Sequence, residues 1–159
     1  MDRIIDDLDA KFARLHQESL ELMQTVSPEL LYRRVLDRSN SAALNSCGEQ
    51  VLRNAAAVEQ TFGGITANLW DDPFEWTLPE ALPTPEKVCG YLAEVEATRK
   101  RGFELFKSDS DLAKEIMSPS GPTQLLPLLL DTLTRAGHYL HGAKATLALL
   151  RAKELSTAN

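Results

Sequence analysis

Apolar residues recur every three or four positions through most of the chain, a spacing that places them on one face of an α-helix. The first such stretch runs from Asp2 to about Thr25 and carries charged residues between its apolar positions, so it predicts an amphipathic helix. Ser27 and Pro28 predict a new start, because serine caps helices and proline suits their first turn. We expect a short helix or turn from there to about Arg38.

A second long helix is predicted to follow a break at residues 39–41 and to reach about Phe62. Its inner face is expected to hold six apolar residues, namely Leu44, Cys47, Val51, Ala55, Val58 and Phe62. The pair Gly63 and Gly64 predicts the end of this helix, or a kink in it if residues 65–69 continue the helix.

The residues from Trp70 to Pro83 form the one long stretch without helical periodicity. Segments of this length are uncommon in compact domains, and we expect its three aromatic residues to cover the side of the bundle or, as the alternative, to form a ligand lid. Thr84 and Pro85 then predict the cap and first turn of a third helix. Its buried stripe comprises Val88, Tyr91, Leu92, Val95, Gly102, Phe103 and Phe106. Its solvated side comprises Glu94, Glu96, Arg99, Lys100 and Arg101.

Residues 107–122 predict a short helical turn followed by a loop. A fourth helix, capped by Thr123 or Gln124, is expected to end near Lys153 and to leave a frayed tail. Proline suits its first turn, where few backbone amides have a partner within the helix. Its buried face is predicted to comprise Leu126, Leu130, Leu133, Gly137, Leu140, Lys144 and Leu147.

Four long amphipathic helices without an alternating strand pattern predict an all-α four-helix bundle, as a single domain over residues 1–159. The connection between the second and third helices has about twenty residues, enough to run along the bundle. A simple alternation of up and down helices is therefore not the only topology open to this chain.

Composition and charge narrow the range of functions. The chain carries a net charge of −6 and lacks a clustered basic face, which argues against binding nucleic acid or anionic membranes. Cys47 and Cys89 are far apart and fit small core residues of a reducing compartment. No signal peptide or apolar run of membrane-spanning length is evident, so we expect a cytoplasmic protein.

Three segments match the motifs of one known family in order and spacing. They are SPELL at 27–31, SCGEQVLRNAA at 46–56 and GHYLHGAKATLALLR at 137–151. The second is similar to the pattern S-x-G-E-x-x-x-H, and the third to H-x-x-x-H-x-G-Q followed by leucines. Over roughly residues 5–153 the chain thus resembles the DinB/YfiT-like superfamily of bacterial four-helix-bundle proteins.

The resemblance implies a divalent metal, often nickel or zinc, held by one histidine of the second helix and two of the last at i and i+4. Known activities of the family include thiol-dependent S-transfer and isomerisation. This chain departs from the pattern, because Arg53 and Gly137 stand at two of the three histidine positions and Lys144 replaces the glutamine. Only His141 matches, and a guanidinium does not ligate a metal. We therefore expect a degenerate three-histidine site.

Two functions are compatible with such a site. The first is a metal-free small-molecule binding or interaction protein, which the resemblance implies to be a homodimer like many relatives, with an anion site at Arg53 near Lys144 and His141. Glu49 and Asn54 are then its polar companions. Alternatively, the arginine lies out along the bundle surface.

The second is a thiol S-transferase or hydrolase that depends on a divalent metal, nickel or zinc, with a thiol as ligand. His138 would then replace the lost ligand beside His141, since residues three apart point to roughly one side of a helix. Both histidines can equally be polar residues at the edge of a groove. The third histidine, His16, is predicted at the surface or boundary of the first helix.

Overall fold

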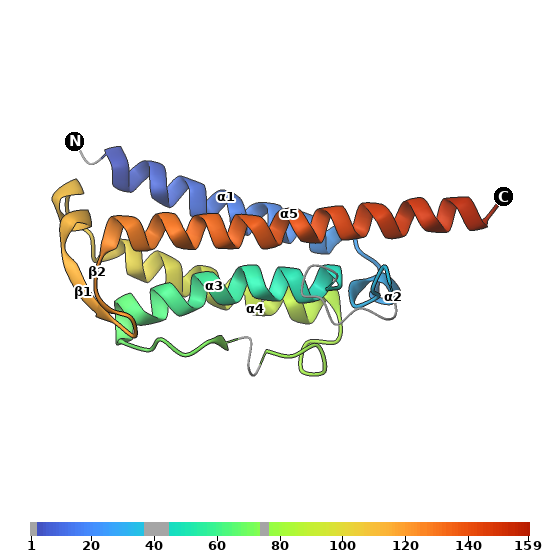
Figure 1. Cartoon of the computed structure of the whole chain (residues 1–159), viewed down its shortest axis with the longest axis horizontal. Coiled ribbons are helices and arrows are strands. Elements are labelled where there is room, and N and C mark those ends of the chain that lie inside the picture. Colours follow the sequence, from blue (N-terminus) through green and yellow to red (C-terminus); the bar gives the residue numbers. More distant parts are fainter. Residues whose placement is uncertain (1–2, 37–44, 74–76) are drawn as a thin grey trace.

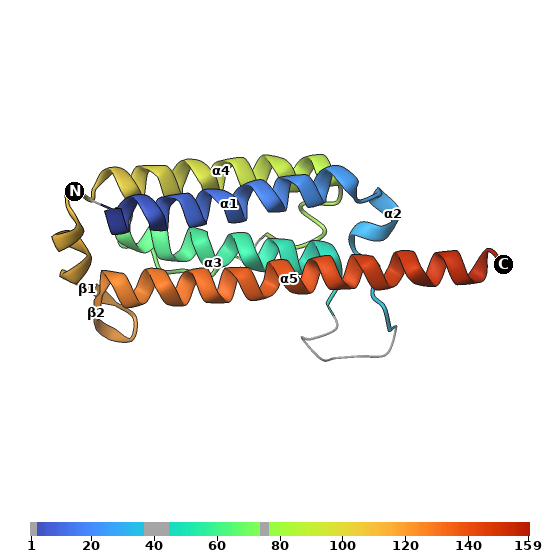
Figure 2. The ribbon, with the colours of Figure 1, turned by 90° about the horizontal axis from the view of Figure 1, so that it is seen from above.

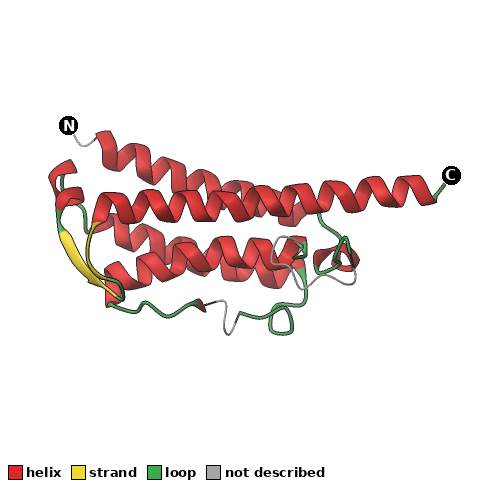
Figure 3. Ribbon diagram, viewed as in Figure 1, coloured by secondary structure: helices red, strands yellow, loops and turns green. Residues whose placement is uncertain are grey.

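The computed structural model describes residues 3–36, 45–73 and 77–159. Four long helices dominate this part of the chain: α1 (Arg3–Thr25), α3 (Cys47–Ala67), α4 (Pro85–Glu104) and α5 (Leu125–Thr157). The shorter elements are α2 (Pro28–Leu31), the 3₁₀ helix η3 (Asp109–Ala113) and an antiparallel pair of strands, β1 (Glu115–Ser118) and β2 (Gly121–Gln124). The chain is therefore predominantly helical, as predicted (Figure 3).

The four long helices lie side by side as a bundle (Figures 1 and 2). α3 packs against α4 and α5, and α1 packs against the same two helices from the opposite corner. α1 and α5 run in one direction and α3 and α4 in the other, as the colours of Figure 1 show. The described parts of the connection between α3 and α4 lie along the bundle, which returns the chain to the end where α3 began. The described parts of this connection thus follow the course along the bundle that its length was expected to allow.

Local signals place the starts of α3 and α4. Ser46 accepts a hydrogen bond from the backbone N–H of Glu49, whose carboxylate accepts one from the backbone N–H of Ser46, so α3 begins with a capping box. Thr84 Oγ1 accepts a bond from the N–H of Lys87 at the start of α4, as predicted. The predicted break at residues 39–41 lies outside the described residues.

Of the two alternatives predicted at Gly63 and Gly64, an end of the helix is wrong, and the helix continues beyond them. It reaches Ala67 and ends at Asn68, whose φ of 54° is the left-handed conformation of a helix cap. Gly64 serves packing instead, because a Cβ there would lie 2.4 Å from the ring of Trp70. A glycine that admits a neighbouring ring therefore has the same sequence signature as one that ends a helix.

The core lies between the four helices. At one end of it the rings of Phe12 (α1), Phe62 (α3) and Phe103 (α4) meet, with centroids 5.1 to 5.8 Å apart. The apolar positions predicted for the second helix are buried in α3, except that Leu44 lies outside the described residues. None of the helices within the described ranges has the length and apolar composition that a membrane crossing requires.

The buried face of α5 differs from the prediction in its first half. Leu130 is 47% exposed, and Leu126 and Leu133 are only partly buried. The helix buries a different row: Leu125, Leu129, Thr132, Ala136, Leu140, Ala143, Thr146, Leu147 and Leu150. Because leucine fills five of the six positions at 125–130, the apolar pattern there is compatible with several rotations of the helix. The helix also continues past the predicted end to Thr157.

The segment before α5 is a helical turn, as predicted, but the predicted loop after it is a β-hairpin. Strand β1 pairs with β2 from Glu115 opposite Gln124 to Ser118 opposite Gly121. Gly121 has a φ of 107°, a conformation that suits glycine at this turn. Strands of four residues are too short for alternation to be recognisable in the sequence.

Candidate functional site

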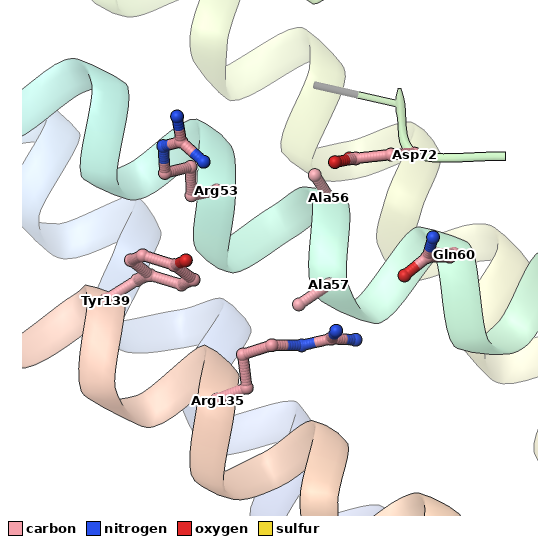
Figure 4. A pocket seen from close by; sticks show the side chains of 7 residues that line it. All are labelled: Arg53, Ala56, Ala57, Gln60, Asp72, Arg135 and Tyr139. Atoms are coloured by element: carbon pink, nitrogen blue, oxygen red, sulfur yellow. The ribbon is translucent and has the colours of Figure 1, made fainter. Parts of the chain in front are cut away.

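A cavity of about 60 Å³ lies between α3 and α5, beside the connection that follows α3 (Figure 4). It is lined by two arginines, a tyrosine, a glutamine, an aspartate and two alanines, namely Arg53, Ala56, Ala57, Gln60, Asp72, Arg135 and Tyr139. We call this site the α3–α5 groove. It is the place where the structure gathers hydrogen-bond donors of both helices around one small space.

Helix periodicity explains why these residues meet. Arg53, Ala57 and Gln60 follow one face of α3 at spacings of four and three residues. Arg135 and Tyr139 are four residues apart, so they share one face of α5. Figure 4 shows the two α5 side chains directed at α3 on either side of Ala57. The small alanine side chains leave the space that larger residues would fill.

Among the described residues that line it, the groove has an excess of positive charge. Arg53 and Arg135 contribute two cations, whereas Asp72, from the connection, contributes one anion. In the parts of the chain that are described, Arg135 forms no ion pair with a carboxylate. The phenol of Tyr139 and the amide of Gln60 add uncharged donors. Guanidinium groups and such donors around one space are suited to binding an anion.

Lys144 and His141 lie elsewhere, in a surface groove between α1 and α5. Lys144 Nζ is 2.9 Å from Glu18 Oε2, and Arg14 Nε is 2.8 Å from the other oxygen of the same carboxylate. The hydrogen bonds from Arg14 and from Lys144 lower the pKa of Glu18. The predicted grouping of Lys144 and His141 with Arg53 is therefore not what the structure contains.

Glu49 has a structural position at the start of α3. Besides its part in the capping box, its Oε1 is 3.0 Å from Nη2 of Arg34. Burial acts to raise the pKa of Glu49, but the hydrogen bonds from Ser46 and Arg34 outweigh it, and the pKa is lowered. Glu49 does not line the α3–α5 groove.

Asn54 is buried on another side of α3, facing α1 and α4. It lines an interior pocket together with Ser19, His16 and Arg99. Arg99 was predicted on the solvated side of its helix and is instead 2% exposed. Its guanidinium bonds to both oxygens of Glu96 at 2.8 and 2.7 Å and to the carboxylate of Asp9, which removes the cost of an unpaired buried charge. Position 99 follows Val95 by four residues, so its place on the buried stripe was available as a signal.

The two histidines of α5 are exposed. His138 stacks edge-on with its neighbour Tyr139 at a centroid distance of 5.8 Å, and His141 faces the groove with α1. Among residues 3–36, 45–73 and 77–159, no three or more His, Cys, Asp or Glu residues lie close enough together to hold a metal ion. The side chains that are described therefore do not fit the three-ligand site that the resemblance implies.

Comparison of the chain with models of known protein families finds no match, and comparison with characterised proteins finds none either. The function must be argued from the chemistry of the α3–α5 groove.

Proposed function

We propose that the protein is a metal-free binding protein for a small monoanion, with a carboxylate as the class of ligand, on a helix bundle of the DinB/YfiT type. The observation that carries this proposal is the meeting of Arg53 from α3 with Arg135 and Tyr139 from α5 around one small cavity. The charge, the size and the arrangement of the groove each support it.

The arrangement supports the scaffold. In the family that the sequence resembles, one metal ligand comes from the second long helix and two come from the last helix at i and i+4. Arg53, Arg135 and Tyr139 have this arrangement across the α3–α5 groove, with the pair on α5 two residues earlier than Gly137 and His141. The groove thus has side chains from the same two helices at the same spacing, on another side of α5 from Gly137 and His141, and its two arginines favour an anion over a metal cation.

The charge and size support a carboxylate. The described lining residues, with two arginines and Asp72, carry a net charge of +1, which one monoanion neutralises. A phosphate dianion would leave an excess of negative charge beside the aspartate. A cavity of about 60 Å³ holds a compact group, and a planar carboxylate matches the paired donors of a guanidinium. Arg135 and Asp72 are exposed, so the rest of the ligand can extend into solvent.

The ligand class is tested by NMR titration of the wild-type chain with benzoate, inorganic phosphate and benzylamine. We expect benzoate to shift the amide signals of α3 and α5 around the groove and benzylamine to leave them unchanged. Arg135→Gln should weaken benzoate binding about tenfold, because a hydrogen bond to a charged group contributes about 1.5 kcal/mol or more. Arg101→Gln on α4 removes the same charge away from the groove and should bind as wild type. Equal affinity in the two variants would rule out the groove as the site.

The proposed likeness to the DinB/YfiT type is tested by introducing three histidines into the α3–α5 groove. A variant with Arg53→His, Arg135→His and Tyr139→His should bind about one equivalent of nickel or zinc. A variant with Arg53→His and Gly137→His, which leaves His141 as the third imidazole, should bind none, because His141 faces the groove with α1 and not Arg53. If the second variant binds metal and the first does not, the assignment of the groove is wrong.

The alternative function, a metal-dependent thiol S-transferase or hydrolase at His138 and His141, is tested on the purified wild-type protein. About one equivalent of nickel or zinc in wild type that is lost in His138→Ala/His141→Ala would replace the anion-binding proposal with this one.

A further inference from the structure

An interior pocket between α1, α3 and α4 contains a second group of polar side chains, separate from the α3–α5 groove. Its cavity has a volume of about 20 Å³. Ser19 from α1 is fully buried, Asn54 from α3 is 3% exposed and Arg99 from α4 is 2% exposed. The half-buried imidazole of His16 and the carboxylate of Glu96 also line the cavity. Three helices thus direct polar groups into a space that is otherwise apolar.

The hydrogen bonds of Ser19 determine how the amide of Asn54 is oriented. Ser19 Oγ lies 2.7 Å from the backbone oxygen of Leu15, one turn earlier in α1, and donates its only hydrogen to it. Toward Asn54 this hydroxyl can then only accept, and it is 2.7 Å from Asn54 Nδ2. The NH₂ group therefore faces Ser19, and the carbonyl oxygen Oδ1 points the other way. A flipped amide would place two acceptors against each other.

Asn54 Oδ1 is shielded from solvent and accepts no hydrogen bond from any described residue. Leaving such an acceptor unpaired costs about 1–3 kcal/mol, and buried polar groups in proteins are almost always paired. The neighbouring guanidinium does not supply the bond: three of its five N–H groups donate to Glu96 and Asp9, and Asn54 Oδ1 has no partner among the described residues. The carbonyl therefore needs a donor that is not part of these side chains.

The cavity restricts this donor to a small, neutral molecule. A volume of about 20 Å³ exceeds the roughly 10–15 Å³ that one water requires and leaves no room for a larger ligand. The surrounding charges balance, since Asp9 and Glu96 face Arg99 and the nearby Lys100, whose Nζ is 3.9 Å from Glu96. A neutral surrounding favours water over a cation of similar size such as ammonium.

We propose that the pocket binds one buried water molecule, which donates one hydrogen to Asn54 Oδ1 and bridges this oxygen to the wall formed by His16 and Glu96. A neutral imidazole has a ring nitrogen that can accept the second hydrogen. Burial lowers the pKa of His16, which is consistent with a neutral ring. The water thereby connects α3 with α1 and α4 at a place where no donor of a described residue reaches Asn54 Oδ1.

The proposal is tested by an atomic-resolution crystal structure together with water-to-protein NOE measurements on the same protein. We expect a density peak at hydrogen-bond distance from Asn54 Oδ1 and a water NOE to nearby protons. Asn54→Leu, which fills the space without an acceptor, should lose both signals. Thr61→Val is the matched control, because it removes a buried hydroxyl that bonds to Thr132 elsewhere in the core, and it should retain the water.

Two results would overturn the proposal. One is a wild-type structure in which Asn54 Oδ1 accepts a bond from a protein donor and the cavity holds no solvent. The other is a water signal that persists in Asn54→Leu. The wild-type structure decides the question by itself if Asn54→Leu does not fold.

Discussion

Replacing Arg99 with methionine tests whether the buried ion pairs of α4 stabilise the bundle. The side chain of Arg99 is 3% exposed, that of Glu96 is 12% exposed and that of Asp9 is 48% exposed. Methionine fills a similar apolar volume but leaves Glu96 without its two guanidinium hydrogen bonds. Its nearest remaining cation is Lys100, at 3.9 Å.

The expected cost follows from this geometry. Removing one partner of a buried ion pair costs about 3–5 kcal/mol, because the other charge stays buried without compensation. Asp9 can be hydrated once released, and the partly exposed Glu96 can turn toward water, so we expect about 2–4 kcal/mol for Arg99→Met. The total stability of a domain is about 5–15 kcal/mol, so this loss is large enough to measure reliably.

Urea denaturation followed by circular dichroism measures these values. Arg99→Met/Glu96→Leu removes the orphaned carboxylate as well and should be more stable than Arg99→Met. Arg14→Met is the control, since Arg14 is 73% exposed in its pair with Glu18 and should cost no more than about 1 kcal/mol. A cost for Arg99→Met no larger than for Arg14→Met, or a double variant less stable than the single one, would refute the reasoning.

Three further predictions concern other parts of the bundle. Gly137→Ala should stabilise the protein by about 0.5–1 kcal/mol, because a Cβ there meets nothing within 4 Å. Gly102→Ala should destabilise it by about 1–3 kcal/mol, because its Cβ would lie 2.4 Å from the buried ring of Phe62. Urea denaturation measures both changes. The hydrogen bonds from Lys114 and from the backbone of residues 107 and 108 lower the pKa of Asp111 to about 2, below its unfolded value near 4. Asp111→Asn should therefore destabilise the protein at neutral pH. The difference in stability between this variant and wild type should fade as the pH falls from about 4 to 2. Burial raises the pKa of Cys47 to about 12, so iodoacetamide should modify only the other cysteine of the native protein, as peptide mass spectrometry would show.

The sequence predicts those elements that depend on local chemistry. Thr84 begins its helix where expected, because the cap bonds to an amide only three residues away. α3 begins at Cys47, later than the predicted start after residues 39–41. The end of α3 was not predictable in the same way, because the role of Gly64 depends on the ring of Trp70, which packs back onto the helix from the connection. A residue whose role depends on a tertiary neighbour cannot be interpreted from its immediate surroundings.

The α5 side of the candidate site could not be predicted from the local sequence either, because it depends on how α5 is rotated about its axis. Each residue turns a helix by about 100°, so the offset of two positions from Tyr139 to His141 separates their directions by about 200°. An alignment anchored on the histidines therefore directs attention to the side of α5 that faces α1, while the side that faces α3 carries Arg135 and Tyr139. The leucine-rich start of α5 allows either rotation, and in the structure Ala136 and Ala143 lie on the buried side. Arg53, which the resemblance singles out, lines the groove, whereas Arg135 and Tyr139 were not singled out, because no local signal in the sequence fixes the rotation of α5.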